Sequence, residues 1–345
     1  RYAAFDVGPR VTNNKNQFQR LLFGINGAWG EWNYDLGYLH SSTSLVGRRT
    51  GYLRYSRVRE VLSTANNPVG AYWRLGDDAH RNSQAMYDYI SPEITAEATT
   101  SLDMLDFKAN RTLWDLPGGP LALAVGAEYR TQKVELTPQT FTDIGDIIGL
   151  GYSAYKGSEK VGVVFAEVLA PIADSLEISA ALRADSYQGG DTAVTPKIGV
   201  KWTPVEWLAL RGTYGEGFRA PNAAESGTGG LAAFTTAPDP IRCPGGVPAP
   251  NGGTQGDCNA ALAVITSPNA NLKPEESKSY TLGFVINPTA STSITIDAWQ
   301  IKRSNEINQE STAAAIRAGN VVRNDNNLPG IPNSGTLLAA RANYV

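Results

Sequence analysis

The sequence predicts an all-β protein, an antiparallel up-and-down transmembrane β-barrel whose long loops contain short helices, and three observations support this fold class. Apolar and polar side chains alternate with a period of two in many segments of the chain. Very short links and long links alternate between these segments along the chain. Tryptophans gather beside the short links. Together these features are typical of barrels of the bacterial outer membrane.

The composition agrees with this fold class. The chain has 345 residues, a length that an all-β barrel occupies as one unit. Charged residues make up 18% of the chain, below the roughly 25% that is usual in soluble domains. The net charge is −3 and there is no basic stripe, so we expect no nucleic-acid partner. No run of about 18 apolar residues occurs, so the sequence predicts no membrane-spanning helix. A barrel has no such run either, because its strands are short and alternate apolar with polar residues.

The alternation is clear where Tyr280, Leu282 and Phe284 share one parity while Ser279 and Thr281 share the other. Such a strand has one apolar face and one polar face. We predict about ten strands of this kind, near residues 18–30, 32–45, 98–115, 120–137, 157–170, 174–188, 193–203, 206–218, 275–287 and 292–304.

The register stays open in two of these strands, 157–170 and 206–218. In the first, the charged Glu167 has the same parity as the apolar Val163 and Phe165. In the second, Trp207 has the parity opposite to Leu208. The pattern does not decide which face of either strand meets lipid.

The links fall into two sets. Very short links are expected around Gly30–Glu31, Pro117–Gly119, Pro171–Ala173, Pro204–Val205 and Asn287–Ser291. Long links cover roughly 46–97, 138–156 and 219–274, with a tail after Asn305. The short link near Gly189–Asp191 is an exception. This alternation predicts tight turns in the periplasm and long loops outside the cell.

Tryptophan placement marks the membrane border on the side of the short turns. Five of the seven tryptophans lie within a few residues of a short link, and these are Trp29, Trp32, Trp114, Trp202 and Trp207. Aromatic side chains form girdles where a barrel wall meets the lipid headgroups. A strand preference of aromatics does not explain why they gather at one end.

The long links have local structure of their own. Short helices are expected at Arg57–Ala65, His80–Ile90 and Gln309–Ala318, and the Gly- and Pro-rich segment 226–258 is expected to be irregular. The acidic pair Asp77–Asp78 is expected on solvated surface.

The two cysteines, Cys243 and Cys258, lie in one Gly/Pro-rich segment, which favours a disulfide in an oxidising compartment. Such a bridge closes a loop of about 15 residues and contributes roughly 3 kcal/mol in the chain-entropy model. The alternative is that the two thiols never meet.

Three stretches resemble the TonB-dependent outer-membrane receptors. They are Gly217-Phe218-Arg219-Ala220-Pro221 after a strand, Asn269-Ala270-Asn271-Leu272-Lys273-Pro274-Glu275 before the next strand, and Leu116-Pro117-Gly118-Gly119-Pro120 followed by Gly126-Ala127-Glu128-Tyr129-Arg130. Their order and spacing are similar to the middle and later part of that family's barrel. The resemblance covers most of the chain and is weakest in the loops.

The resemblance implies a barrel of about 22 strands whose lumen holds an N-terminal plug domain. It also implies a ligand bound by the outer loops and the plug apex, and coupling of the plug to an inner-membrane TonB-ExbB-ExbD complex. The expected partners are outer-membrane lipid, the plug, this complex and a small-molecule or oligosaccharide ligand. Because the chain has about ten predicted strands and no plug, coupling box or signal peptide pattern, we expect residues 1–345 to be part of the barrel domain of a longer receptor.

The chemistry of the motif residues and their positions beside the loops predict structural roles for them. We expect Arg219 and Glu275 to form an ion pair at the base of the longest loop, and contact with an anionic ligand is the alternative. Pro221 and Pro274 suit strand ends, where no backbone donor is needed. Charged residues of lumen parity are expected to face the plug or water, and these are Glu128, Arg130, Glu177, Arg183, Asp185 and Arg211.

Catalytic and metal chemistry are not predicted. His40 and His80 have no metal-ligand spacing, and Asp325-Asn326-Asn327 resembles a calcium loop but lacks the glutamate that completes one. No nucleophile elbow, phosphate loop or dinucleotide motif is present, so we expect neither an enzyme nor a cofactor.

The leading hypothesis is active uptake of a scarce solute, such as a siderophore–metal complex, a cobalamin or an oligosaccharide. A passive porin, a secreted β-rich adhesin or structural protein, and a β-rich hydrolase are the alternatives. Membrane fractionation separates the barrels from the soluble classes, and the sequence does not name the solute.

Overall fold

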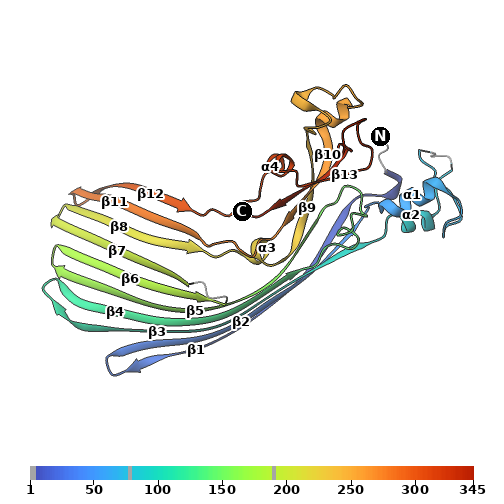
Figure 1. Ribbon diagram of the computed structural model, residues 1–345. Helices are drawn as coiled ribbons and strands as arrows, with labels where there is room; N and C mark the ends of the chain where they lie inside the picture. Colours follow the sequence, from blue (N-terminus) through green and yellow to red (C-terminus); the bar gives the residue numbers. More distant parts are fainter. Residues whose placement is uncertain (1–4, 77–79, 189–191) are drawn as a thin grey trace.

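The computed structural model describes residues 5–76, 80–188 and 192–345. In this part of the chain fourteen strands form one sheet, and ten of them follow each other as an antiparallel wall (Figure 1). The wall consists of β1 (Val11–Trp29), β2 (Trp32–Thr50), β3 (Ile94–Leu116), β4 (Gly119–Leu136), β5 (Tyr152–Ala173), β6 (Leu176–Tyr187), β7 (Thr192–Val205), β8 (Leu208–Arg219), β11 (Glu275–Thr289) and β12 (Thr292–Ser304). The expected all-β fold and its ten strands are confirmed.

The wall is a curved open sheet with β1 and β12 at its edges (Figure 1). All five tight turns lie at one end of the wall, and the helices and remaining strands lie at the other end. The strands extend further toward the loop end than the alternation predicted, as β1 does from Val11 rather than residue 18. Beyond the lipid neither face needs to be apolar, so the period-two signal fades there although the hydrogen-bond ladder continues.

A second sheet arm branches from the loop end of β5. Residues 161–173 of β5 pair with β6, whereas residues 152–156 pair with β9. From there the arm continues through β10 and β14 to β13. We call this unit the outer arm, and its strands are β9 (Thr228–Ala237), β10 (Ala260–Ser267), β13 (Val321–Arg323) and β14 (Leu337–Asn343).

The expectation of an irregular segment at 226–258 is wrong for its first part, because β9 occupies residues 228–237. Gly229 and Gly230 give this strand a weak local signal. Its strand conformation comes from pairing with β5 on one side and β10 on the other. These partners are distant in sequence, so no local pattern reveals them.

Short helices lie in the loops, close to three of the predicted positions. They are α1 (Tyr55–Ser63), α2 (Gln84–Ile90), α3 (Ala223–Ser226) and α4 (Thr312–Arg317), with 3-10 turns at Phe5–Val7, Pro244–Gly246 and Gln255–Asn259. Helix α2 begins later than expected because the Ser83 side chain caps it by accepting from the Met86 amide. None of the helices in the described ranges is long and apolar enough to cross a membrane.

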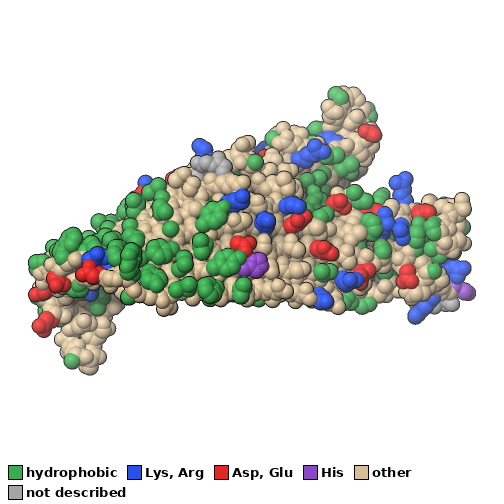
Figure 2. Space-filling view, turned by 90° about the horizontal axis from the view of Figure 1, so that it is seen from below, with side chains coloured by type: hydrophobic (Ala, Val, Ile, Leu, Met, Phe, Trp, Pro, Cys, Tyr) green, Lys and Arg blue, Asp and Glu red, His purple; other side chains and the backbone are tan. Residues whose placement is uncertain are grey.

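The wall exposes its apolar side chains instead of burying them. Leu182 is 52% exposed, Val164 is 60% exposed and Ile296 is 58% exposed. Figure 2 shows apolar side chains gathered toward the end of the tight turns on the face seen there. Packed cores lie in the loops, where Val61, Trp73, Met86 and Ile90 form one cluster. The wall therefore has the surface expected of a protein whose partner on one side is lipid.

The ladder registers settle the two open strands. Phe165 lies opposite Arg183 and Gly126, which places Val163 and Phe165 on the polar, concave face together with Glu167. Strand β5 therefore has apolar residues on both faces, and Val163 is 3% exposed. Trp207 lies in the turn between β7 and β8, which explains its parity.

The short link predicted at Gly189–Asp191 and the acidic pair Asp77–Asp78 lie outside the described residues.

Candidate functional site

The Arg219 guanidinium is the centre of an ion-pair cluster at the loop end of the wall. Arg219 is the last residue of β8 and lies directly opposite Glu275, the first residue of β11. Its Nε and Nη2 atoms each donate to the Glu275 carboxylate at 2.8 Å. This is the two-point geometry that makes an arginine–carboxylate pair strong and directional.

Arg219 binds a second carboxylate that the sequence analysis did not identify. Its Nη1 and Nη2 atoms donate to Glu225 at 2.9 and 3.1 Å. Glu225 also accepts from the backbone amide of Asn222, whose side chain in turn accepts from the amides of Ala224 and Glu225. This reciprocal capping box starts α3. The spacing Asn222-x-x-Glu225 is its sequence signature and was available to identify Glu225.

The cluster connects four segments that are far apart in the sequence. Glu275 also accepts from the backbone amide of Ile307 at 2.9 Å. Asn269 donates from its amide to the Glu225 carbonyl at 2.7 Å and from its side chain to the Tyr344 carbonyl at 3.0 Å. Thus β8, α3, the start of β11 and the segment after β12 meet at one point of the rim. Truncating Arg219 would leave two carboxylates facing each other.

The other motif residues surround this cluster. Phe218 packs edge-on against Tyr187, with ring centroids 5.9 Å apart. A Cβ atom at Gly217 would meet the Ser277 hydroxyl at 2.9 Å, so the close approach of β8 and β11 favours glycine there. Ala220, Pro221, Leu272 and Pro274 line a cavity, while Asn271 and Lys273 are exposed.

A cavity of about 890 Å³ lies on the concave side of the rim, and we call it the vestibule. The motif segments and α3 form one side of it. Arg130 and Gln132 of β4, with Glu159 of β5 and Tyr187 of β6, form the other side. The vestibule therefore combines amide, charged and aromatic side chains, which suits a polar ligand with flat or ring-shaped parts.

Below the vestibule three arginines of the concave face pair with carboxylates. Arg130 donates to Glu128 at 2.7 Å. Arg183 binds Asp185 at 2.8 and 2.7 Å, and the Asp185 side chain is 1% exposed. Arg211 of β8 reaches across β11 to Asp297 of β12 at 2.7 Å. These three arginine–carboxylate pairs are neutral, so they do not give this face a charge of one sign.

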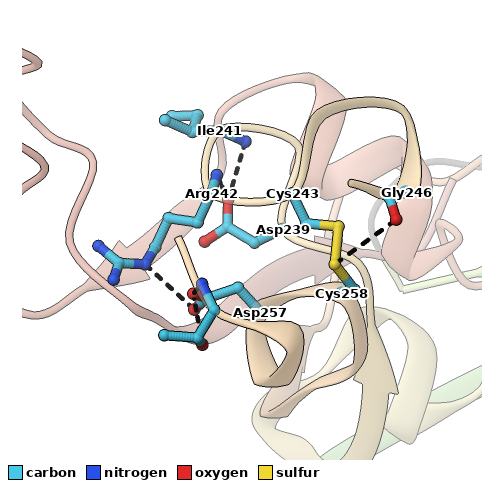
Figure 3. The surroundings of a disulfide bond; sticks show 8 residues. Asp239, Ile241, Arg242, Cys243, Gly246, Asp257 and Cys258 are labelled. Carbon is cyan, nitrogen blue, oxygen red and sulfur yellow. Dashed lines mark hydrogen bonds and ion pairs between the residues drawn. A yellow bond between two sulfur atoms is a disulfide. The ribbon is translucent and has the colours of Figure 1, made fainter. Parts of the chain in front are cut away.

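The outer arm is built differently, around buried ion pairs and a disulfide (Figure 3). Cys243 and Cys258 are joined in a disulfide with their Cα atoms 5.1 Å apart. Arg242 donates to Asp257 at 3.1 Å, and both side chains are almost fully buried. Burial raises the pKa of Asp257, but the hydrogen bonds from Thr254 and Arg242 outweigh burial and hold this pKa below its ordinary value.

A second buried pair joins distant parts of the arm. Arg323 of β13 donates to Asp239 at 2.6 and 2.9 Å, and the Asp239 side chain is fully buried. Arg323 also donates to the Gly335 carbonyl at 2.8 Å. An apolar cluster of Leu262, Ile316 and Leu337 lies in the same unit. The arm therefore folds like a small soluble domain at the loop end of the wall.

The histidines are not placed for metal binding. His40 Nδ1 lies 2.7 Å from the Asp103 carboxylate, with which it forms a hydrogen-bonded pair. Within the described ranges no group of three histidine, cysteine or acidic side chains is arranged to hold a metal ion.

With this geometry in place, the comparisons with known proteins assign the chain to a class. Residues 2–333 match the family described as TonB dependent receptor-like, beta-barrel. The chain belongs to this family, and the resemblance seen in its motifs is confirmed. No curated protein matches the chain.

Solved structures share the fold at low identity. The RagAB peptide transporter is 11% identical with a TM-score of 0.53, over 87% of this chain and 31% of that one. The siderophore receptor PirA from Acinetobacter baumannii is 13% identical with a TM-score of 0.48, over 98% of this chain and 49% of that one. The ferric enterobactin receptor PfeA from Pseudomonas aeruginosa, in a mutant bound to enterobactin, is 13% identical with a TM-score of 0.46, over 97% and 57%. The chain thus spans about half or less of the length of RagAB and PirA, and somewhat more than half of PfeA.

Proposed function

We propose that this chain is the barrel-wall part of an outer-membrane receptor that takes up a scarce solute with energy from the inner membrane. The observation that carries the proposal is the division of the wall into an exposed apolar face and a polar concave face that opens into the vestibule. Such a division suits a barrel that lies in the outer membrane and has its ligand entrance on the outer side of the cell. Membership of the TonB-dependent receptor family supports energy coupling.

In this proposal the wall is completed by further strands and filled by a plug domain in the whole receptor. The paired charges of the concave face, such as Arg183–Asp185 and Arg211–Asp297, suit contact with a plug because a paired surface can be covered at low electrostatic cost. The plug would couple to the TonB-ExbB-ExbD complex. The solute classes we propose are a siderophore–metal complex, a cobalamin and an oligosaccharide, and the receptor acts as a transporter and not as an enzyme.

The test is uptake by a deletion strain that carries the receptor gene on a plasmid. We expect the wild-type gene to restore uptake of one solute class, and a proton uncoupler to abolish it. The variant Gln132→Trp narrows the vestibule and is expected to lower uptake about tenfold at unchanged abundance in the outer membrane. The control Gln300→Trp adds the same bulk on the opposite face of the wall, away from the vestibule. Uptake that survives the uncoupler would indicate a passive porin instead.

A further inference from the structure

The convex face of the wall changes from apolar to polar over a short distance along its strands. We call a set of residues that lie directly opposite each other on neighbouring strands a row. One row places Ile25, Leu36 and Phe107 side by side, and the next places Phe23, Tyr38, Leu105 and Tyr129 side by side. These rows share the parity of the exposed apolar residues, so they face lipid in the proposed orientation. Tyrosines in the last apolar row suit the outer border of the lipid, as tryptophans suit the inner one.

The next row toward the loop end marks the border with charged groups. It contains His40 and Asp103, which pair at 2.7 Å, together with Lys160. The Tyr38 hydroxyl of the row below also donates to Asp103 at 3.1 Å. Figure 2 shows that apolar side chains become sparser on this face away from the end of the tight turns.

Two polar rows follow, and they line a shallow groove of about 630 Å³ on the convex face. The first row contains Gln19, Ser42, Ser101, Lys133 and Ser158, and the second contains Gln17, Ser44, Thr99, Glu135 and Lys156. The groove is thus lined by hydroxyl and amide groups with two ammonium groups at one end. A binding surface of this composition suits a sugar that has phosphate groups.

The charges around the groove favour an anion. Lys156 Nζ lies 3.0 Å from the Glu135 carboxylate, whereas Lys133 forms no ion pair with any described residue. On the same face Lys15 lies beyond Gln17 and Lys160 lies below Ser158. The further acidic groups there are Glu97 and Asp103, which is paired with His40. Four lysines therefore face three carboxylates in this region of the wall.

The distance of the groove from the acyl chains of the membrane indicates which ligand can reach it. Its two rows lie four and six residues beyond the last apolar row on their strands. At about 3.3 Å per residue and a strand tilt of about 40°, this is on the order of 10–15 Å above the acyl chains. A phosphate next to the acyl chains lies too low to reach both rows. A glycolipid with several phosphorylated sugars reaches them.

We propose that this groove binds the phosphorylated saccharide head group of a glycolipid in the outer leaflet. The inference rests on the proposed outer-membrane orientation of the wall. Lys133 and Lys156 bind the phosphates, and the serine, threonine and glutamine side chains bind sugar hydroxyls. The bound lipid fixes the height of the wall in the membrane at the strands that lead to the outer loops.

The test uses the receptor purified from outer membranes in a mild detergent. The probe is an acylated glucosamine disaccharide that is extended by several phosphorylated sugars. The other ligands tested are its dephosphorylated form, its acyl-free form and inorganic phosphate. We expect the double variant Lys133→Gln/Lys156→Gln to bind the phosphorylated lipid at least tenfold more weakly than wild type. The control Lys278→Gln lies on the same convex face, beside Glu216 on the far side of the wall, and is expected to bind normally.

Three results would overturn the inference. If the double variant binds the phosphorylated lipid as tightly as the wild type, the two lysines are not part of the site. Equal binding of the dephosphorylated lipid would remove the phosphate requirement, and equal binding of the acyl-free form or inorganic phosphate would exclude a lipid as the specific ligand. The heat-induced gel shift of each variant is measured in parallel, so that a correctly inserted barrel that does not bind overturns the groove alone and not the proposed transport function.

Discussion

The wall and the outer arm are two parts of one sheet that are stabilised in opposite ways. The wall exposes large apolar side chains such as Leu282, at 52%, and depends on its long ladders and on lipid. The arm buries Leu337 to 1% exposure and also buries the Asp239–Arg323 and Arg242–Asp257 pairs. The medium on each side of a strand, rather than the strand itself, therefore decides where polar groups are tolerated.

The largest effect is expected from Arg323→Met. Asp239 would remain fully buried without its counter-charge, which costs about 3–5 kcal/mol in comparable cases. We expect local unfolding of the arm, seen as faster amide exchange in residues 228–267, while the ladders of β1 to β4 stay protected. The exposed pair Arg48–Glu93 supplies the control Arg48→Met, with an effect below about 1 kcal/mol. Equal exchange in both variants would mean that burial does not distinguish the arm from the wall.

The disulfide offers a second way to weaken the arm alone. Replacing Cys243 and Cys258 together by alanine removes a cross-link across 15 residues and is expected to cost roughly 3 kcal/mol. Limited proteolysis should then cut within residues 244–257, and a reducing agent should produce the same cut in the wild type. The heat-induced gel shift of the barrel should not change, and if it did, the arm and the wall would be one cooperative unit.

The wall is tested by placing the same charge on its two faces. Leu282→Arg puts a guanidinium on the apolar face and is expected to cost about 2–3 kcal/mol of stability in a bilayer. Its chain neighbour Thr281 points to the concave face and bonds to Thr213 there, so Thr281→Arg should cost less than about 1 kcal/mol. Urea unfolding in lipid vesicles measures the difference, and equal midpoints would contradict the assignment of the faces.

A smaller effect is expected where the wall and the arm meet. Arg219→Met removes four hydrogen bonds and leaves Glu225 and Glu275 facing each other, but Arg219 is 42% exposed and water screens the loss. We expect about 2 kcal/mol, measured as faster amide exchange in α3 and at the start of β11. Adding Glu225→Gln should restore part of the loss by removing the repulsion, and no recovery would show that the two carboxylates do not interact.

The family comparison and the structure confirm most of the wall that the sequence predicts. The alternation of Tyr280, Leu282 and Phe284 follows directly from a strand with lipid on one side, so it is visible without any partner strand. The tight turns, the tryptophans beside them and the two cysteines are local features as well. The motif residues Arg219 and Glu275 were identified from the resemblance, and Glu225 was missed although the capping-box spacing was present.

The local pattern of side chains is enough to place the segments that form the wall and the turns between them, because lipid imposes a period of two on each strand separately. Three features become visible only when the strands are paired: β9 pairs with β5, Glu167 faces the concave side, and two polar rows form a groove on the convex face. These features depend on the register between strands that are distant in sequence. A ladder shifted by one residue would keep every local pattern and yet assemble different rows.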